Sequence, residues 1–335
     1  MQEIIKEVMQ SYRVYPTEIE EITERLVRIK DGQRDYALKR STLTKENIPA
    51  WLRVYHIANE KKLAEIAPVY VTRDGKLYKE MDESFFYLTP WIESPNRANL
   101  KNEIENTMQY LGHLHEKTKT SQRISKDTLT QNFLTYQTHC AQVPTELNAI
   151  VRQFEGNRYL SPFELLVCTQ FRDIEYASKM NNDIIREFLD PSDEDLTWNQ
   201  CLCHGNLTQD HTLGRYIINW ENARYDHPVM DLANYFSHLT GNYDQPQNKI
   251  TEAFKLYKNQ NDLNEIELKL LTIYLLNPSS YLTTIREYVN NTSKKSMVIQ
   301  IRELQQQYRK LIFALNWNKF MKEEYETIAF EDADH

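Results

Sequence analysis

The sequence predicts an α+β protein of two lobes, in which a small antiparallel sheet with one helix precedes a larger, mostly helical lobe. Three observations lead to this prediction. Short alternating segments separated by turn signals fill most of residues 1–93. Long apolar patterns of helical period dominate residues 94–335. The chain of 335 residues is also long enough to bury two cores.

In the small lobe, three short strands are expected within residues 16–40, in the segments PTEIEEI, RLVRI and DYALKR. Asp31 and Gly32 form a hairpin turn signal between the last two strands. Residues 46–62 then change to apolar steps of three and four, with Pro49 placed as in a first helical turn. This segment is the predicted helix of the small lobe.

Two more strands are expected in the segments VYVTRDGKLYKE and SFFYLTPWI, the first around a second Asp-Gly turn at Asp74 and Gly75. The second strand leads into a hinge at residues 88–93, which ends the small lobe. At the start of the chain, the segment MQEIIKEVMQSYRV interleaves charged and apolar residues and predicts a short amphipathic helix. It lacks the uninterrupted apolar region of a signal peptide.

The larger lobe is predicted from long helical patterns with few strand signals between them. These patterns cover residues 99–118, 123–142, 161–189, 248–260, 264–277 and 296–327. One β-hairpin is expected to interrupt the helices, formed by residues 200–204 and 216–220 on either side of a short turn.

Glycine is scarce in this chain, with seven residues where average usage would give about 23. No two glycines stand closer than nine positions apart. The glycine-rich dinucleotide fingerprint and the phosphate-binding P-loop are therefore excluded, because both need clustered glycines to bring backbone N–H groups against phosphate. A nucleotide would have to be held in another way.

Charge and cysteine content narrow the class of protein further. The net charge of −8 disfavours nucleic acid as a partner, because neutralising phosphates needs a clustered basic excess. No apolar run approaches the roughly 18 residues of a membrane span, so no span is expected. The cysteines are few and scattered, which indicates reduced thiols of a protein made in the cytoplasm: Cys140, Cys168, Cys201 and Cys203.

A strand lysine, a hinge and a helical lobe with one hairpin follow one another in the order of a protein-kinase-like chain. Lys39, in the segment YALKRS, takes the place of the lysine that pairs nucleotide phosphates. A strand lysine considered alone is more often a solvated surface residue. The prediction therefore depends on the segments that follow.

Three later segments supply that context: TMQYLGHLHE at residues 107–116, CHGNLTQDH at 203–211 and IINWENARYDHPVMDLA at 217–233. They resemble the aminoglycoside phosphotransferase/choline-kinase-like superfamily, where a helix ending in Leu-His precedes H-G-D-x-x-x-x-N, I-D-W-E and D-P-x-x-D-L-A motifs. The length, the DYALK segment and the YLTPWIE hinge are most similar to the spore-coat kinase-like proteins of bacilli (CotS/YutH type), above all the endospore coat-associated YutH kind. The resemblance implies a two-lobed protein-kinase-like fold.

The chain departs from the superfamily at three chemically important positions. In an active member, an aspartate handles the proton of the acceptor hydroxyl, while an amide and a second aspartate hold magnesium against the phosphates. Here these positions are Asn206, His211 and Asn219. The Asn206 amide cannot act as a general base near neutral pH. Asn219 offers Mg²⁺ one neutral oxygen, and the His211 nitrogen suits zinc or copper better, so the three changes predict loss of phosphotransfer.

Two gaps agree with this prediction. The turn near residues 20–24 has no glycine for a phosphate-covering loop, and no acid stands between residues 47 and 59, where the glutamate partner of the lysine would be expected. Glu46 and Glu60 flank this second stretch. Spacing alone does not assign the acidic partner of Lys39.

An active enzyme is the first alternative interpretation. Asp210 and Glu221 are carboxylates close in sequence to the three positions that depart from the superfamily pattern. On a strand, Glu221 would face the same side as Asn219. The two carboxylates could serve a rewired ATP-dependent small-molecule phosphotransferase, although both would have to replace base and metal ligand within angstrom tolerances. ATP and Mg²⁺ are expected only under this alternative, and no cofactor is expected otherwise.

A nucleotide-binding module without turnover is the second alternative. Lys39 and the hinge residues Thr89 and Trp91 would then be the binding residues. A binding module, an active phosphotransferase and a pseudokinase scaffold would differ in how they respond to ATP with and without Mg²⁺.

Cys201, Cys203, His204 and His211 together offer the donor types of a soft-metal cluster. The two cysteines share one strand face, whereas His204 points to the other. Structural zinc sites also prefer C-x₂₋₄-C spacing. No metal site is therefore predicted, and the cysteines are interpreted as small core residues.

The main prediction is a pseudokinase that acts as a structural or assembly protein of the bacterial spore coat. The resemblance alone implies the coat role, spore-coat proteins as partners, and synthesis in the cytoplasm of the mother cell. It also implies structural roles for His204, Gly205 and Asp231 around the former catalytic loop. The oligomeric state is not predicted.

Overall fold

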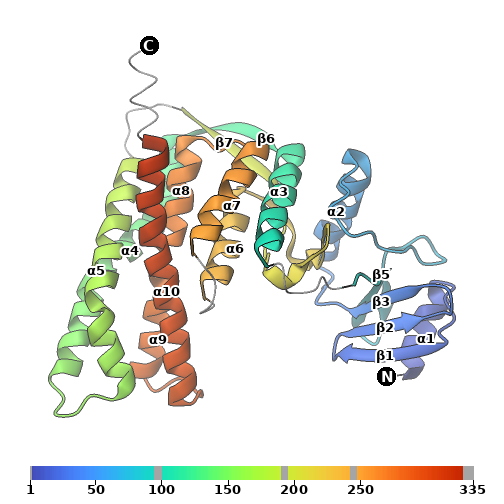
Figure 1. The fold of residues 1–335 in the computed structure, drawn as a ribbon, viewed down its shortest axis with the longest axis horizontal. Helices are drawn as coiled ribbons and strands as arrows, with labels where there is room; N and C mark the ends of the chain where they lie inside the picture. The colour runs from blue at the N-terminus through green and yellow to red at the C-terminus, as the bar shows by residue number, and fades with distance from the viewer. Residues whose placement is uncertain (1, 94–99, 190–194, 242–246, 327–335) are drawn as a thin grey trace. The chain divides into compact units, whose positions relative to one another are not determined.

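The computed structural model describes residues 2–93, 100–189, 195–241 and 247–326 (Figure 1). The chain forms two compact units. Unit 1 comprises Met1–Lys119, Cys201–Asp226 and Asn259–Asn261, and unit 2 comprises Thr120–Gln200, His227–Lys258 and Asp262–His335. The predicted lobe boundary after residue 93 falls at residues 94–99, outside the described residues, and stays a prediction.

Unit 1 contains a five-stranded antiparallel sheet in the order β1-β2-β3-β5-β4. Asp31 closes the β2–β3 hairpin, because its carboxylate accepts the backbone N–H groups of Gln33 and Arg34. The strands are β1 (Glu18–Thr23), β2 (Leu26–Lys30), β3 (Asp35–Arg40), β4 (Lys79–Met81) and β5 (Ser84–Pro90). The three strands predicted within residues 16–40 are confirmed, as is the strand in SFFYLTPWI.

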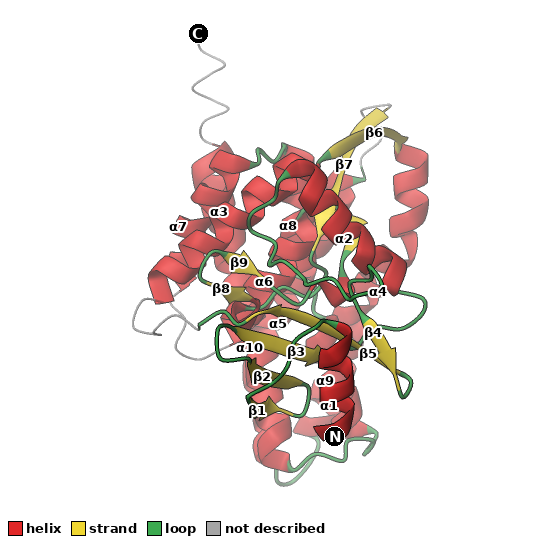
Figure 2. Ribbon diagram, turned by 90° about the vertical axis from the view of Figure 1, so that its right-hand side faces the viewer, coloured by secondary structure: helices red, strands yellow, loops and turns green. Residues whose placement is uncertain are grey.

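Helix α1 (Gln2–Ser11) packs on one face of this sheet (Figure 2). Its apolar residues Ile5, Val8 and Met9 are buried in one cluster with strand residues that include Leu38 and Leu88. This amphipathic helix was expected from the N-terminal segment. With α2 (Ile48–Lys61), residues 1–93 therefore contain two helices rather than one.

Alternation along β5 separates the two faces of the sheet. Phe86 and Leu88 belong to the cluster with α1, whereas Tyr87 contacts Trp51 of α2, with ring centroids 5.2 Å apart. Lys39 on β3 lies directly opposite Tyr87 in the strand register. The strand lysine therefore lies on the α2 side of the sheet and not in the α1 core.

The strand predicted in VYVTRDGKLYKE is largely wrong, because only its end forms β4. The residues before β4 form turn hydrogen bonds instead of pairing with a strand. The backbone N–H of Thr72 donates to the Lys76 carbonyl, and the backbone N–H of Gly75 donates to the Thr72 carbonyl. The Asp-Gly turn signal was correct, with Gly75 at a φ of +79°. The turn is followed by a short edge strand and not by a long hairpin arm.

The rest of unit 1 carries most of the segments that resemble kinase motifs, and the last of them continues into unit 2 from His227 on. Helix α3 (Leu100–Thr118) confirms a predicted helix. The hairpin predicted between residues 200–204 and 216–220 is wrong: the end of β7 (Asp195–Cys203) pairs with β10 (Arg224–Asp226). β9 (Tyr216–Ile217) pairs with β8 (Thr212–Leu213) around Gly214, whose φ of +58° permits the tight turn.

Two short 3₁₀ turns, Gln209–His211 and Trp220–Asn222, connect these strands. They occupy positions where continuous strand or a short turn was expected. The second of these turns carries Glu221.

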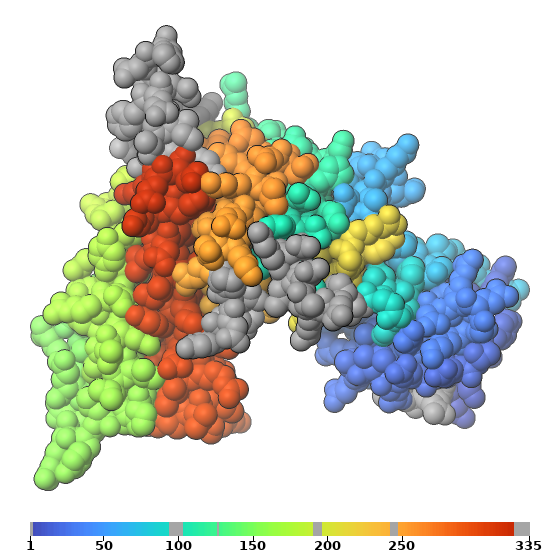
Figure 3. Space-filling model, viewed as in Figure 1, coloured from blue at the N-terminus to red at the C-terminus, as the bar shows by residue number. Residues whose placement is uncertain are grey.

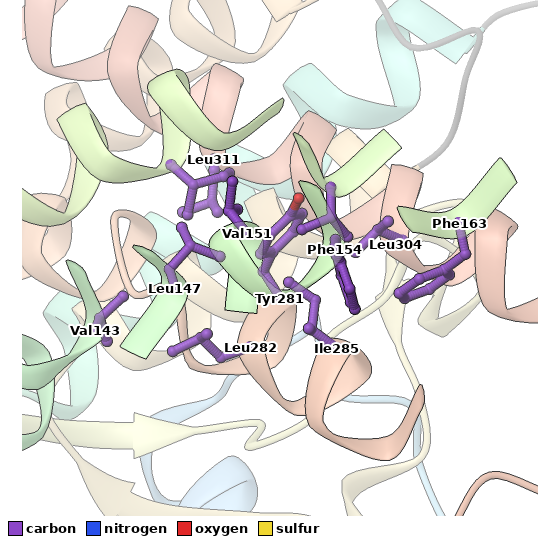
Figure 4. Close-up of a cluster of buried hydrophobic side chains, with 12 residues drawn as sticks. Val143, Leu147, Val151, Phe154, Phe163, Tyr281, Leu282, Ile285, Leu304 and Leu311 are labelled. Atoms are coloured by element: carbon purple, nitrogen blue, oxygen red, sulfur yellow. The ribbon is translucent and has the colours of Figure 1, made fainter. Parts of the chain in front are cut away.

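Unit 2 is mostly helical. Its apolar core joins α4, α5, α9 and α10, with side chains that include Leu147, Phe163 and Leu282 (Figure 4). α5 lies along α10 in a continuous packed surface (Figure 3). The helices are α4 (Lys126–Glu155), α5 (Pro162–Phe188), α6 (Val229–Gly241), most of α7 (Gln247–Gln260), α8 (Glu265–Leu275), α9 (Ser279–Val289) and α10 (Met297–Met321), followed by a π-helical turn at Lys322–Glu326.

The helix predicted at residues 123–142 needs correction. Residues Thr120–Ser125 form β6, which pairs with β7, and α4 begins after Ser125 and continues through Pro144. α6 and α9 were not predicted as helices. No helix among the described residues is apolar over a length that would cross a bilayer.

Candidate functional site

Lys39 is the centre of a polar cluster inside unit 1. Its ammonium lies 2.9 Å from Glu221 Oε1 and donates to Asn219 Oδ1 at 2.5 Å. Alternation on β3 places the neighbouring Leu38 in the apolar core and leaves Lys39 on the opposite face. The acidic partner that spacing could not assign is therefore Glu221, and neither Glu46 nor Glu60 has this role.

A turn, and not a strand, brings Asn219 and Glu221 together. Asn219 has a φ of 67° in the left-handed region and precedes the 3₁₀ turn Trp220–Asn222. Asparagine tolerates this conformation better than most residues. Asn219 and Glu221 do face the same side, toward Lys39, as predicted. The prediction that they lie on a strand is wrong, because residues 220–222 form a 3₁₀ turn.

Glu221 is buried, with 6% of its side chain exposed, and both of its oxygens are engaged. Oε1 also accepts the Tyr87 hydroxyl at 2.9 Å. Oε2 accepts the backbone N–H of Thr42 at 3.2 Å and the Thr42 hydroxyl at 2.5 Å. Thr42 carried no sequence signal, whereas Tyr87 could have been found from its register opposite Lys39.

Burial alone would raise the pKa of the Glu221 carboxyl. The charge of Lys39 and the hydrogen bonds from Thr42 outweigh this effect, so the pKa lies below its usual value. Burial and the nearby Glu221 charge raise the pKa of the Tyr87 phenol well above its usual value. The cluster at neutral pH is thus an ammonium–carboxylate pair with neutral hydroxyl donors around it.

His204 holds the loop of residues 204–211 through backbone contacts. Its Nε2 donates to the Ile218 carbonyl at 2.8 Å, and its Nδ1 accepts the backbone N–H of Asn206 at 3.3 Å. One tautomer satisfies both contacts. The ring also stacks on that of His211 with centroids 5.2 Å apart.

His211 stands where the superfamily motif has an amide, and its Nδ1 donates to the Asn206 carbonyl at 2.8 Å. Burial, followed by the charges of His204 and Lys39, lowers the pKa of His211 to about 4. Its imidazole is therefore neutral at physiological pH. The side chains of Asn206 and Asp210 are exposed.

The lowered pKa of His211 predicts a pH-dependent stability. Between pH about 6.5 and about 4 the unfolded chain binds a proton at this histidine while the folded chain does not, so stability falls as pH falls through this window. His211→Asn should reduce this loss, and the exposed His56→Asn should not. Urea unfolding at pH 7, 5.5 and 4.5 measures it; equal losses in the wild type and His211→Asn would refute it.

The hinge residues Thr89 and Trp91 lie at the end of β5 and just after it. Thr89 pairs with Ala37, and the backbone N–H of Trp91 donates to the Asp35 carbonyl at 3.0 Å. The Arg28 guanidinium lies 4.7 Å over the Trp91 ring. The backbone N–H and the ring of Trp91 thus already contact other groups of the sheet.

Asp231 lies in the first turn of α6, within unit 2, and is fully buried. Cys201 and Cys203 are fully buried in unit 1, with their sulfurs 3.7 Å apart. The imidazole next to these thiols belongs to His115, not to His204 or His211. Sequence spacing did not associate His115 with the cysteines.

Solved structures of small-molecule kinases share the fold of this chain. An aminoglycoside phosphotransferase from Alicyclobacillus acidocaldarius is 15% identical, with a TM-score of 0.71 over 95% of this chain and 96% of that one. Spectinomycin phosphotransferase APH(9)-Ia bound to AMP is 14% identical, with a TM-score of 0.60 over 94% and 98%. Choline kinase LicA from Streptococcus pneumoniae is 13% identical, with a TM-score of 0.50 over 93% and 99%. The predicted kinase-like fold is confirmed.

The sequence comparison assigns the chain to one family. A model of the family described as "Spore coat putative kinase YutH" matches residues 5–314, so the chain belongs to that family. This confirms the resemblance drawn from the motif segments. Among the curated proteins, none matches the sequence.

Proposed function

We propose that this chain is a pseudokinase that serves the bacterial spore coat as a structural or assembly protein. The observation that carries the proposal is the engagement of Lys39 by the Asn219 amide oxygen and the Glu221 carboxylate. The groups that would hold phosphate and metal in an active relative bind one another in this chain.

Metal binding would have to break this cluster. The single oxygen of Asn219 accepts from the Lys39 ammonium, and the two oxygens of Glu221 accept from Lys39, Tyr87 and Thr42. Mg²⁺ needs several oxygen ligands in octahedral geometry and loses water reluctantly. A neutral amide and a carboxylate saturated by donors are poor ligands for it.

Asn206 and His211 are also poorly suited to act as a base in proton transfer. Asn206 is an exposed amide and cannot accept a proton near pH 7. The pKa of His211 lies at about 4, and its Nδ1 proton is donated to the loop. A base with this pKa accepts a hydroxyl proton poorly at neutral pH.

Membership in a family described as spore coat supports the coat role. Spore-coat proteins are then the partners, and synthesis takes place in the cytoplasm of the mother cell. No cofactor is needed for this role. ATP and Mg²⁺ belong only to the rival interpretation, in which Asp210 and Glu221 would replace the missing groups.

One observation favours a second candidate, a nucleotide-binding module without turnover. A lysine–glutamate ion pair is itself part of the active arrangement in protein kinases, where it positions the lysine for phosphates. The Lys39–Glu221 pair could position Lys39 in the same way. Against this, Pro90 has no N–H and the Trp91 N–H is donated to Asp35, so these two hinge positions offer a base no backbone donor.

The expected result is that neither ATP nor ATP with Mg²⁺ raises the melting temperature of the full chain, and that no ATP is hydrolysed. A ligand that binds only the folded state must raise the melting temperature at concentrations above its Kd. Stabilisation by ATP without Mg²⁺ and without turnover would favour the binding module. Magnesium-dependent stabilisation with turnover would overturn the pseudokinase proposal.

A gain-of-carboxylate variant provides the positive comparison. Asn206→Asp combined with Asn219→Asp restores two carboxylates of the superfamily pattern and should increase Mg²⁺ binding, measured by calorimetry. Asn222→Asp adds a charge at an exposed neighbouring position and serves as the control. Equal Mg²⁺ binding by both variants would show that the missing carboxylates are not the obstacle.

A further inference from the structure

His115, Cys201 and Cys203 form a buried cluster that the proposed function does not use. All three side chains are 0% exposed, and one donor atom from each lies within 4.8 Å of the others. The cluster belongs entirely to unit 1. Imidazole and thiolate are the donors that thiophilic metal ions select.

The main chain holds these three residues together. Cys201 and Cys203 alternate along β7 and therefore share one face, while His115 lies in the last turn of α3. Thr118, also in that turn, accepts the backbone N–H of Leu202 through its hydroxyl oxygen at 3.0 Å. The donors are thus arranged before any ion binds, which lowers the entropy cost of binding.

The separation of the two sulfurs fits metal coordination. Zinc–sulfur bonds of about 2.3 Å at a tetrahedral angle place two sulfurs about 3.8 Å apart. The Sγ atoms of Cys201 and Cys203 lie 3.7 Å apart. The Cys203 thiol donates a hydrogen bond to the Asp226 carbonyl oxygen at 3.5 Å, so this oxygen also lies beside the cluster.

Charge balance favours a divalent ion. Two thiolates and one neutral imidazole bring two negative charges into a fully buried site. Buried charges are tolerated when they are paired, and one Zn²⁺ cancels both. Cu⁺ accepts the same soft donors but leaves one negative charge.

We propose that His115, Cys201 and Cys203 bind one thiophilic metal ion, for which Zn²⁺ is the best match. Binding releases the thiol protons, so affinity rises with pH. The ion links the end of α3 to β7 immediately before the His204–Gly205 loop. It is a structural link, and it does not depend on whether the chain transfers phosphate.

The four cysteines of the chain provide matched variants for the test. The full chain is stripped with a chelator under reducing conditions and refilled with Zn²⁺, Cu⁺ or, as a spectroscopic probe, Co²⁺. Elemental analysis should find one ion per chain, and Co²⁺ should give thiolate charge-transfer absorption. Cys203→Ser and His115→Gln should lose the ion, whereas the unit 2 variants Cys140→Ser and Cys168→Ser should retain it.

A measurement on the wild type alone guards against variants that do not fold. In native protein, bound Zn²⁺ should slow alkylation of Cys201 and Cys203, identified by peptide mass, and should not slow that of Cys168. Retention of Cu⁺ in place of Zn²⁺ at the same three residues supports the site. A wild type that retains no ion and shows no zinc-dependent protection overturns the proposal, as does retention by Cys203→Ser.

Discussion

Replacing Glu221 with alanine is expected to destabilise the protein by about 3–5 kcal/mol, because the change leaves a partly buried ammonium without its carboxylate. The Lys39 side chain is only 19% exposed, and Tyr87 and Thr42 lose their acceptor at the same time. Urea unfolding followed by tryptophan fluorescence measures the loss. A loss below about 1 kcal/mol, the range of an exposed pair, would contradict this account of the cluster.

An exposed pair of the same residue types provides the control. Lys45 and Glu80 lie 3.8 Å apart with side chains 83% and 51% exposed, so Glu80→Ala should cost less than about 0.5 kcal/mol. The double change Lys39→Met with Glu221→Leu removes both charges together. It should recover most of the stability lost in Glu221→Ala, because desolvation of an unpaired charge is then avoided.

Gly205→Ala is expected to have the second large effect, a loss of more than about 4 kcal/mol or failure to fold. A Cβ atom at Gly205 would stand 2.2 Å from the backbone oxygen of Asn222 and 2.6 Å from the Arg224 guanidinium. The guanidinium can move, but the backbone oxygen belongs to the turn that places Glu221. Thermal unfolding and soluble yield measure the effect.

Gly75→Ala separates steric overlap from backbone strain. Gly75 has a φ of +79°, close to the +80° of Gly205, but a Cβ there meets nothing within 4 Å. Its substitution should cost about 1–2 kcal/mol, the strain of a left-handed alanine. Similar losses in the two variants would mean that the close approach of Asn222 is unimportant. A larger loss of stability in Gly205→Ala than in Gly75→Ala would show that Gly205 is needed for the packing of the loop, whether or not the loop takes part in a reaction.

Elements set by local signals were predictable from the sequence. The alternation of DYALKR gives β3 and the outward face of Lys39, and Ser161 with Glu164 forms the capping box that begins α5. Elements set by distant partners were not. β6 is a polar segment stabilised by pairing with β7, about 75 residues away, and the residue 200–204 strand finds its partner in β10.

The candidate site divides in the same way. Motif spacing selected Asn206, His211 and Asn219 together with the strand lysine, and the structure brings two of these, Lys39 and Asn219, into contact. Spacing could not identify the partner of Lys39, because the contact spans 182 positions (221 − 39) and depends on the left-handed turn at Asn219. Thr42 completes the cluster through a backbone N–H and a hydroxyl that no residue pattern marks.

The Lys39 cluster has a consequence for how the protein responds to its surroundings. An ammonium attached to the chain cannot diffuse away, be chelated, or fall in concentration as a magnesium ion or a nucleotide can, so its effective concentration at these oxygens is fixed by the fold. The loop around Asn219 therefore keeps this internal partner whatever the concentrations of Mg²⁺ and nucleotide around the protein. For the structural role proposed in the spore coat, such constancy is more useful than catalysis.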